Sequence, residues 1–181
     1  LVKGEGSIVV TRNGFFVGIE AEQGFWAAGT SASLTVVAEK PDGSLMATKG
    51  AVVIEEISFA GEHGDVVQEA AIAKIPTETR TDLPVTVSWR APKAGQFRVS
   101  YVTKDAQGQE VRASTVLWAV GPGFTGARYR MNGLELVAEE RTYRPGETAR
   151  VLLNVDRAGA SVLLATKVDQ GTLIDWKIIE M

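Results

Sequence analysis

The sequence lacks cysteine altogether and has a single histidine, His63, among its 181 residues. Without cysteine the chain can form no disulfide, no thiolate metal site and no cysteine nucleophile. One histidine argues against a histidine-based metal site, because zinc sites usually draw on several imidazole or thiolate ligands. We expect His63 to lie solvated in a loop over residues 61–64, and we expect neither a metal nor a cofactor. The lack of cysteine says little about compartment, since extracytoplasmic β-domains with large cores manage without disulfides.

Long apolar runs and a concentrated basic surface are also missing. No apolar run approaches the about 20 residues that a membrane-spanning helix needs, and the chain has no charged and then apolar start of the signal-peptide kind. The formal net charge is −3, which argues against nucleic acid as a partner because phosphate binding needs clustered positive charge. The chain begins with Leu1, so we expect an excised fragment whose targeting segment lies outside it.

Catalytic motifs are weak. The segment Gly121-Pro-Gly123-Phe-Thr-Gly126 has the spacing of a dinucleotide-binding fingerprint, but the mechanism needs a helix after it and the sequence continues into a strand pattern. We interpret Gly121, Gly123 and Gly126 as an interdomain hinge. A serine triad would need His63 as its base, and no Gly-x-Ser-x-Gly elbow is present. We find no catalytic site and predict that the chain is not an enzyme.

Two other function classes stay open. Glutamates are paired at positions 20/22, 55/56 and 139/140; a glycosidase uses two carboxylates across a cleft, although acids on half-exposed strands usually face solvent. Among the four tryptophans, Trp89 and Trp118 are in phase with apolar neighbours and are expected in the core. Trp26 falls in a loop expected over residues 24–30 and is the candidate for stacking on a sugar ring. The alternatives are therefore a polysaccharide-acting enzyme fragment and an adhesin-like or carbohydrate-binding β-sandwich module.

What the sequence does contain is a succession of short strands. Apolar residues alternate with polar ones at 15–21, 34–39, 85–89, 97–101 and 111–120; apolar and β-branched runs cover 8–10 and 50–59. Turn signals separate them at Asn13-Gly14, Pro41-Asp42-Gly43 and Asp105-Ala-Gln-Gly108, where Gly108 suits a left-handed position. Seven or so strands at a spacing of roughly 8–12 residues predict an all-β, antiparallel sandwich over residues 1–120. Residues 66–81 are ambiguous: 69–74 could form a helical turn, but Pro76 favours an irregular edge strand.

Residues 121–132 are expected to form a linker, because glycines and a proline interrupt the strand pattern there. Strands resume at 134–138, 148–155, 161–168 and 172–179. Pro145-Gly146 predicts a tight turn, and the strand after it alternates, with Ala149, Val151, Leu153 and Val155 on one side. This turn and the strand after it are the reference for an internal repeat.

The turn and strand also occur earlier in the chain. The ten residues from Gly29 align with the ten from Gly146, 117 positions later, and Ala47-Thr-Lys49 aligns with Ala165-Thr-Lys167, 118 positions later. Two matches at nearly one spacing predict a tandem domain of about that length. Residues 133–181 are less than half of such a unit, so the second domain is expected to be incomplete. Its missing strands would come from another chain or from sequence outside this fragment; otherwise its own strands dock onto the first unit.

These segments resemble bacterial alpha-2-macroglobulins. Tyr143-Arg-Pro-Gly-Glu-Thr-Ala-Arg-Val-Leu-Leu, with Gly133-Leu-Glu-Leu-Val before it and Ala160-Ser-Val-Leu-Leu-Ala-Thr-Lys after it, resembles the opening of the family's bait-region domain. The earlier unit is similar to the macroglobulin domain that precedes it, through Ala91-Pro92, Gly95-Gln-Phe97-Arg-Val, Asp105-Ala-Gln-Gly108 and Val116-Leu-Trp118. The resemblance implies a macroglobulin or fibronectin-III-like sandwich over residues 1–120, a linker at 121–132 and the start of a second, bait-region domain at 133–181.

The family's proteins are extracytoplasmic protease traps. Proteases cut a bait segment, the shell of macroglobulin domains rearranges, and many members attach to the protease through a Cys-Glx thioester. The resemblance thus implies a non-catalytic scaffold fragment of a periplasmic or cell-surface inhibitor, with proteases as the trapped targets and neighbouring macroglobulin domains as partners. This chain has no cysteine, so a thioester would lie outside it. Its C-terminal strands stop about where a bait segment could be inserted, and residues 127–132 would suit a protease that cuts after arginine.

Overall fold

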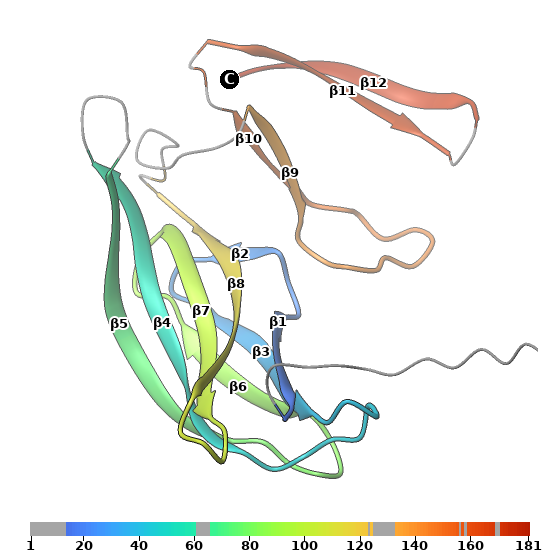
Figure 1. Cartoon of the computed structure of the whole chain (residues 1–181). Helices are drawn as coiled ribbons and strands as arrows, with labels where there is room; N and C mark the ends of the chain where they lie inside the picture. The colour runs from blue at the N-terminus through green and yellow to red at the C-terminus, as the bar shows by residue number, and fades with distance from the viewer. Residues whose placement is uncertain are drawn as a thin grey trace, which may run out of the picture.

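The computed structural model describes residues 14–60, 66–122, 124, 133–155, 157, 159–168 and 171–181. Within these residues the regular structure consists of twelve β-strands (Figure 1). The first eight form one unit, and the last four form two separate two-stranded sheets. The first unit contains β1 (Phe16–Ala21), β2 (Phe25–Ala27), β3 (Ser31–Glu39), β4 (Lys49–Ala60), β5 (Val66–Glu78), β6 (Val85–Arg90), β7 (Gly95–Lys104) and β8 (Glu110–Val120).

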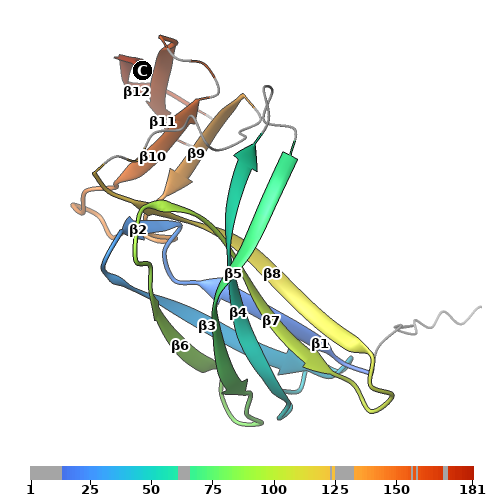
Figure 2. The ribbon, with the colours of Figure 1, turned by 90° about the vertical axis from the view of Figure 1, so that its left-hand side faces the viewer.

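The first unit is a two-layer β-sandwich, as its alternating sequence predicts. One layer is a three-stranded sheet of order β1-β3-β6, and the other is a five-stranded sheet of order β2-β8-β7-β4-β5 (Figure 2). Neighbouring strands run antiparallel except at one place. The short strand β2 runs parallel to β8, and the predicted all-β sandwich is confirmed. The expectation of a plain loop over residues 24–30 is wrong, because residues 25–27 form β2.

The core lies between the two sheets and follows the period of two. In β3, Leu34, Val36 and Ala38 are fully buried, while the intervening side chains are partly exposed. Phe97 and Val99 of β7 are fully buried and belong to the same apolar cluster as Leu34 and Val36. Burying a large apolar side chain stabilises the fold by about 1.5–3 kcal/mol, so this alternation fixes which face of each strand turns inward.

A buried hydroxyl network closes the end of this core. The Tyr101 hydroxyl lies 2.9 Å from Thr48 Oγ1 and 3.2 Å from the Thr48 carbonyl oxygen, and Thr79 Oγ1 lies 2.9 Å from Thr48 Oγ1. Thr79 also donates to the Met46 carbonyl oxygen at 2.9 Å. Each buried hydroxyl thus has a partner, which avoids the cost of an unsatisfied polar group.

The ambiguous segment forms the edge strand β5, which pairs only with β4 among the described strands. The pairing shifts register between Ile54 and Glu55, and Ile72 is exposed at that bulge. Pro76 is tolerated because an edge strand leaves one row of N–H groups without a ladder partner. The edge-strand alternative is therefore confirmed, and the helical turn is not formed.

The predicted turn at residues 105–108 is also confirmed. Gly108 has a φ of +80°, and Asp105 Oδ1 accepts hydrogen bonds from the N–H groups of Gln107 and Gln109 at 3.0 and 2.8 Å. Other expectations fall outside the described residues: the strand at 8–10, Asn13 of the Asn13-Gly14 turn, the loop containing His63, and residues 125–132 of the linker.

The second unit begins with the hairpin-like pair β9 (Leu134–Ala138) and β10 (Val151–Val155), followed by the hairpin of β11 (Ser161–Lys167) and β12 (Leu173–Glu180). The pair β9–β10 repeats β1–β3 at a spacing of 117 residues. Ala21 pairs with Leu34 and Val17 with Ala38 in the first unit; in the second, Ala138 pairs with Val151 and Leu134 with Val155. All five registered pairs of β9–β10 obey this shift.

The turns repeat as well. Glu22 N–H donates to the Ser33 carbonyl at 3.1 Å, and Glu139 N–H donates to the Arg150 carbonyl at 2.9 Å. Gly29 and Gly146 have φ values of +82° and +90°, the left-handed conformation that favours glycine. The second sequence match is different: Lys49 begins β4, whereas Lys167 ends β11. The match at 117 is therefore a structural repeat, and the match at 118 pairs residues that occupy different places.

Candidate functional site at the junction of the two units

The two units meet where β1 leads into β2 and where β9 ends. Gly24 N–H donates to the Glu139 carbonyl oxygen at 2.9 Å, and Gln23 Nε2 donates to Glu140 Oε1 at 2.8 Å. Gln23 and Glu140 also form an isolated antiparallel bridge. We call this contact, made by residues 20–24 and 137–141, the junction.

The junction joins equivalent positions of the repeat. Gln23 and Glu140 are 117 residues apart, which is the repeat spacing, and each follows the end of the first strand of its own unit. The two strand ends therefore meet through the same part of the repeat. A local sequence signal exists for this, since Ala21-Glu-Gln23 and Ala138-Glu-Glu140 align, but that alignment does not reveal that the segments touch.

Gly24 is the position at which the junction tolerates no side chain. A Cβ at residue 24 would overlap the Ala138 carbonyl oxygen and would lie 2.7 Å from Val137 Cγ1. Real Cβ atoms essentially never come that close to another heavy atom, and the overlapped carbonyl belongs to a backbone that β10 already holds. Glycine is therefore needed here for close approach of two chains.

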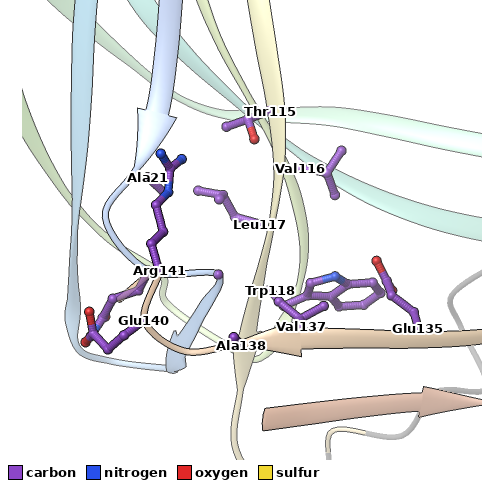
Figure 3. A pocket seen from close by; sticks show the side chains of 12 residues that line it. Ala21, Thr115, Val116, Leu117, Trp118, Glu135, Val137, Ala138, Glu140 and Arg141 are labelled. Carbon is purple, nitrogen blue, oxygen red and sulfur yellow. The ribbon is translucent and has the colours of Figure 1, made fainter. Parts of the chain in front are cut away.

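An ion pair and a pocket flank these contacts. Arg141 Nη1 lies 2.7 Å from Glu20 Oε2, with both side chains more than half exposed, so the pair contributes about 0–1 kcal/mol. A pocket of about 420 Å³ lies between β8, β9 and the turn after β1. Trp118, Val137 and Glu135 line it, and Arg141 and Glu140 lie at its other end (Figure 3).

The Trp118 side chain lines this pocket from β8 of the first unit. It is only 3% exposed, yet it is not part of the cluster between the sheets, to which its neighbours Leu117 and Ala119 belong. Its ring packs edge-on against Phe124, with centroids 5.9 Å apart. The expectation that Trp118 is buried is confirmed, but it is buried on the outer face of β8 beside the second unit.

On the second unit, a tyrosine holds the segment that leads to the junction. The Tyr143 hydroxyl accepts from Glu140 N–H at 2.9 Å and lies 3.4 Å from the Arg150 carbonyl oxygen. The predicted Pro145-Gly146 turn is confirmed, with Glu147 N–H donating to the Arg144 carbonyl at 3.0 Å. These bonds fix the long connection between β9 and β10, and with it the position of Glu140.

Of the three glycines predicted to form a hinge, the structure describes Gly121. Gly121 follows β8, and its carbonyl oxygen accepts from Phe124 N–H at 3.0 Å. A Cβ at residue 121 would meet Ala28 Cβ at 3.4 Å and Ala94 Cβ at 3.8 Å, so Gly121 sits in a packed surrounding. Gly123 and Gly126 lie outside the described residues, and hinge motion about these glycines stays a prediction.

The predicted place of Trp26 is wrong. Trp26 lies in β2 and is 2% exposed, with its ring edge-on to Trp89 at 6.0 Å. It is buried because β2 adds to the edge of β8 and carries the indole into the core. A ring buried in this way presents no face to a sugar. Of the four tryptophans, Trp176 of β12 is the one with an exposed ring, at 58%.

Several of the paired glutamates lie beside basic side chains. Glu55 and Glu56 lie near Arg112 and Lys93, with N–O distances of 3.9 and 2.8 Å, and Glu139 lies 3.3 Å from Arg150. Among the described residues, the carboxyl groups with a displaced pKa are in surface turns. Side-chain and backbone hydrogen bonds from Ser44 lower the pKa of Asp42, and the hydrogen bond from Arg80 lowers the pKa of Asp82.

In the described part of the chain, no cluster of three or more histidine, aspartate or glutamate side chains could hold a metal ion. Among the same residues, no helix is long and apolar enough to cross a membrane. The site that the structure offers is the junction, a contact between the two units built from backbone and amide hydrogen bonds.

No protein-family model matches the sequence, and a search of curated proteins found no match. The solved structures that are similar include two that we describe. One is sporulation control protein Spo0M from Bacillus subtilis, at 9% identity over 60% of this chain and 50% of that chain, with a TM-score of 0.44. The other is the native conformation of E. coli alpha-2-macroglobulin, at 17% identity over 95% of this chain and 12% of that chain, with a TM-score of 0.48. The chain thus spans half of the first protein and about an eighth of the second. At these identities neither likeness carries a statement about activity.

Proposed function

We propose that the chain is a non-catalytic structural segment of an alpha-2-macroglobulin-like, protease-trapping inhibitor that acts in the periplasm or at the cell surface. The sequence phrases behind the resemblance occupy turns and core strands: Ala91-Pro92 lies between β6 and β7, residues 105–108 join β7 to β8, and Val116 to Trp118 lie in β8. They are positions that set the shape of the modules, as expected for a scaffold.

The observation that carries the proposal is the repeated unit and its specific junction. A protein whose shell rearranges as a whole needs modules that transmit movement to one another. Here the equivalent strand ends of two successive units are held together by backbone and side-chain hydrogen bonds. A displacement of the second unit would therefore be passed to β1 and β2 of the first through Gln23 and Gly24.

The test uses the complete protein that contains this chain. It is incubated with a protease, and cleavage of a large protein substrate is compared with cleavage of a small peptide substrate. Trapping inside a shell blocks the large substrate and leaves the small one accessible. Equal inhibition of the cleavage of both substrates would indicate an inhibitor that binds the protease active site. If the cleavage of neither substrate is inhibited, the proposal is contradicted.

A carbohydrate-binding module was the main alternative. Its sequence argument rested on Trp26, which is buried in the core. We therefore take the scaffold function as the conclusion, with neighbouring macroglobulin-type modules as the direct partners of this chain and proteases as the targets of the whole protein.

A further inference from the structure

The second unit exposes the apolar row that its sequence alternation predicts to be a core face. Leu134, Leu136 and Val151 are 52%, 54% and 47% exposed, although they alternate along β9 and β10 as core residues do. The opposite face of the pair is occupied: Glu135 and Val137 line the junction pocket, and Asn154 is buried and donates to Glu135 at 3.1 Å. One face of β9–β10 thus meets the first unit, and the other is exposed at Leu134, Leu136 and Val151, while Leu153 and Val155 on it are half-buried.

The repeat shows what this open face corresponds to. At a spacing of 117 residues, Leu136 and Val151 take the places of Ile19 and Leu34, which are 5% and 0% exposed in the first unit. The residue types are alike and the strand register is the same. The difference lies in the neighbours: in the first unit β3 also pairs with β6, and the five-stranded sheet covers the face.

The free edge of β10 has the geometry that receives a strand. Glu139 N–H bonds to the Arg150 carbonyl, so in an antiparallel ladder the polar groups of Arg150 and of alternate residues after it turn toward β9. Those of Val151 and Leu153 then turn away from β9. In the first unit their equivalents, Leu34 and Val36, pair with Val87 and Val85 of β6. Within the described residues β9 is the only sheet neighbour of β10.

We propose that the free edge of β10 binds an extended strand equivalent to β6, antiparallel to β10 and in the register that β6 takes on β3. The occupant is a strand of the same repeat type, with apolar side chains at alternate positions, as in Val85-Thr-Val87-Ser-Trp89. The added strand places these side chains beside Val151 and Leu153, the equivalents of Leu34 and Val36, and converts β9–β10 into a three-stranded sheet. This inference goes beyond the scaffold function, because it defines a strand-accepting edge whatever the whole protein inhibits.

Two physical reasons favour strand addition at this site. A two-stranded sheet is marginal by itself in water, and an exposed edge with an apolar face is a template for pairing with a further strand. Main-chain hydrogen bonds supply affinity in such additions, and alternate side chains supply specificity. The β11–β12 hairpin adds a second open apolar face, because Leu163 pairs with Ile178 and both are more than half exposed.

The experiment adds a synthetic peptide with the sequence of residues 84–91 to the full chain and follows backbone amide hydrogen exchange. Exchange at Val151 and Leu153 is expected to slow by about tenfold or more, since their N–H groups gain ladder partners. The control peptide differs only by Val87→Asp, which directs a charge into the apolar face, and it is expected to give no protection.

A pair of variants of the chain tests the face itself. Val151→Lys keeps an exposed position exposed in the free chain but puts a charge directly beside the incoming strand, so the peptide should no longer protect β10. Phe16→Lys makes the same kind of change at a residue 47% exposed in the first unit and should leave protection unchanged. The proposal is overturned if neither peptide protects β10, if both protect it equally, if Val151→Lys has no effect, or if β10 is already protected in a dimer of the free chain.

Discussion

Replacing Gly24 by alanine should separate the two units without unfolding the first. The new Cβ would overlap the Ala138 carbonyl and lie 2.7 Å from Val137 Cγ1, so the strand end of the second unit must move away. That movement breaks the hydrogen bonds from Gly24 N–H to Glu139 and from Gln23 Nε2 to Glu140, of 2.9 and 2.8 Å. At about 0.5–1.5 kcal/mol each, their loss destabilises the docked arrangement by about 1–3 kcal/mol, which lowers the docked-to-undocked ratio by about 5- to 150-fold.

The assay is site-resolved hydrogen exchange on the intact chain. In Gly24→Ala the amide of residue 24 should exchange faster by that factor, while the amides of the buried core positions Val52 and Val99 keep their protection. Gly14→Ala is the matched control, because a Cβ at residue 14 meets no other described atom within 4 Å. Unchanged exchange at residue 24 would refute the reasoning. Equal loss of protection at residue 24 and in the core would show general unfolding instead of undocking.

Three further substitutions test other parts of the structure. Tyr101→Phe removes a buried hydroxyl bonded to Thr48 and should lower the free energy of unfolding by about 1–3 kcal/mol, measured by urea denaturation; an unchanged value would contradict the network. Trp26→Ala should cost about 3–5 kcal/mol because the ring is buried, whereas an exposed ligand platform would lose almost nothing. Arg80→Ala should raise the pKa of Asp82, which the hydrogen bond from Arg80 holds below the ordinary value of 3.8; the check is an NMR titration of the Asp82 carboxyl, and an unmoved midpoint would reject the pairing.

Period-two alternation predicts most of the first unit, because each strand has one face in the core. It places β3, β6 and β7 correctly and puts Leu34, Trp89 and Phe97 in the interior. It fails for β2, whose three residues are too few to show a period and whose parallel pairing with β8 is a contact between distant segments. Trp26 was misplaced for the same reason: its burial comes from that pairing.

The repeat at 117 is visible in the sequence, but its consequences are not. The glycines at 29 and 146 mark equivalent left-handed positions, and the sequence alignment finds them. The contact of Gln23 with Glu140 depends on how the two units are placed in space, which no local pattern specifies. Alternation also cannot say whether other strands cover an apolar row. Leu136 and Val151 therefore look like core residues in the sequence, although their side chains are exposed in the structure.

The most direct test of the central claim, that two copies of one repeat are joined in a fixed arrangement, is a distance measurement across the junction. Because the chain has no cysteine, one spin label can be placed on exposed Leu83 of the first unit and one on exposed Leu163 of the second without other changes. Pulsed electron paramagnetic resonance should give one narrow distance distribution that broadens in Gly24→Ala. A broad distribution in the unaltered chain, insensitive to Gly24→Ala, would contradict the account.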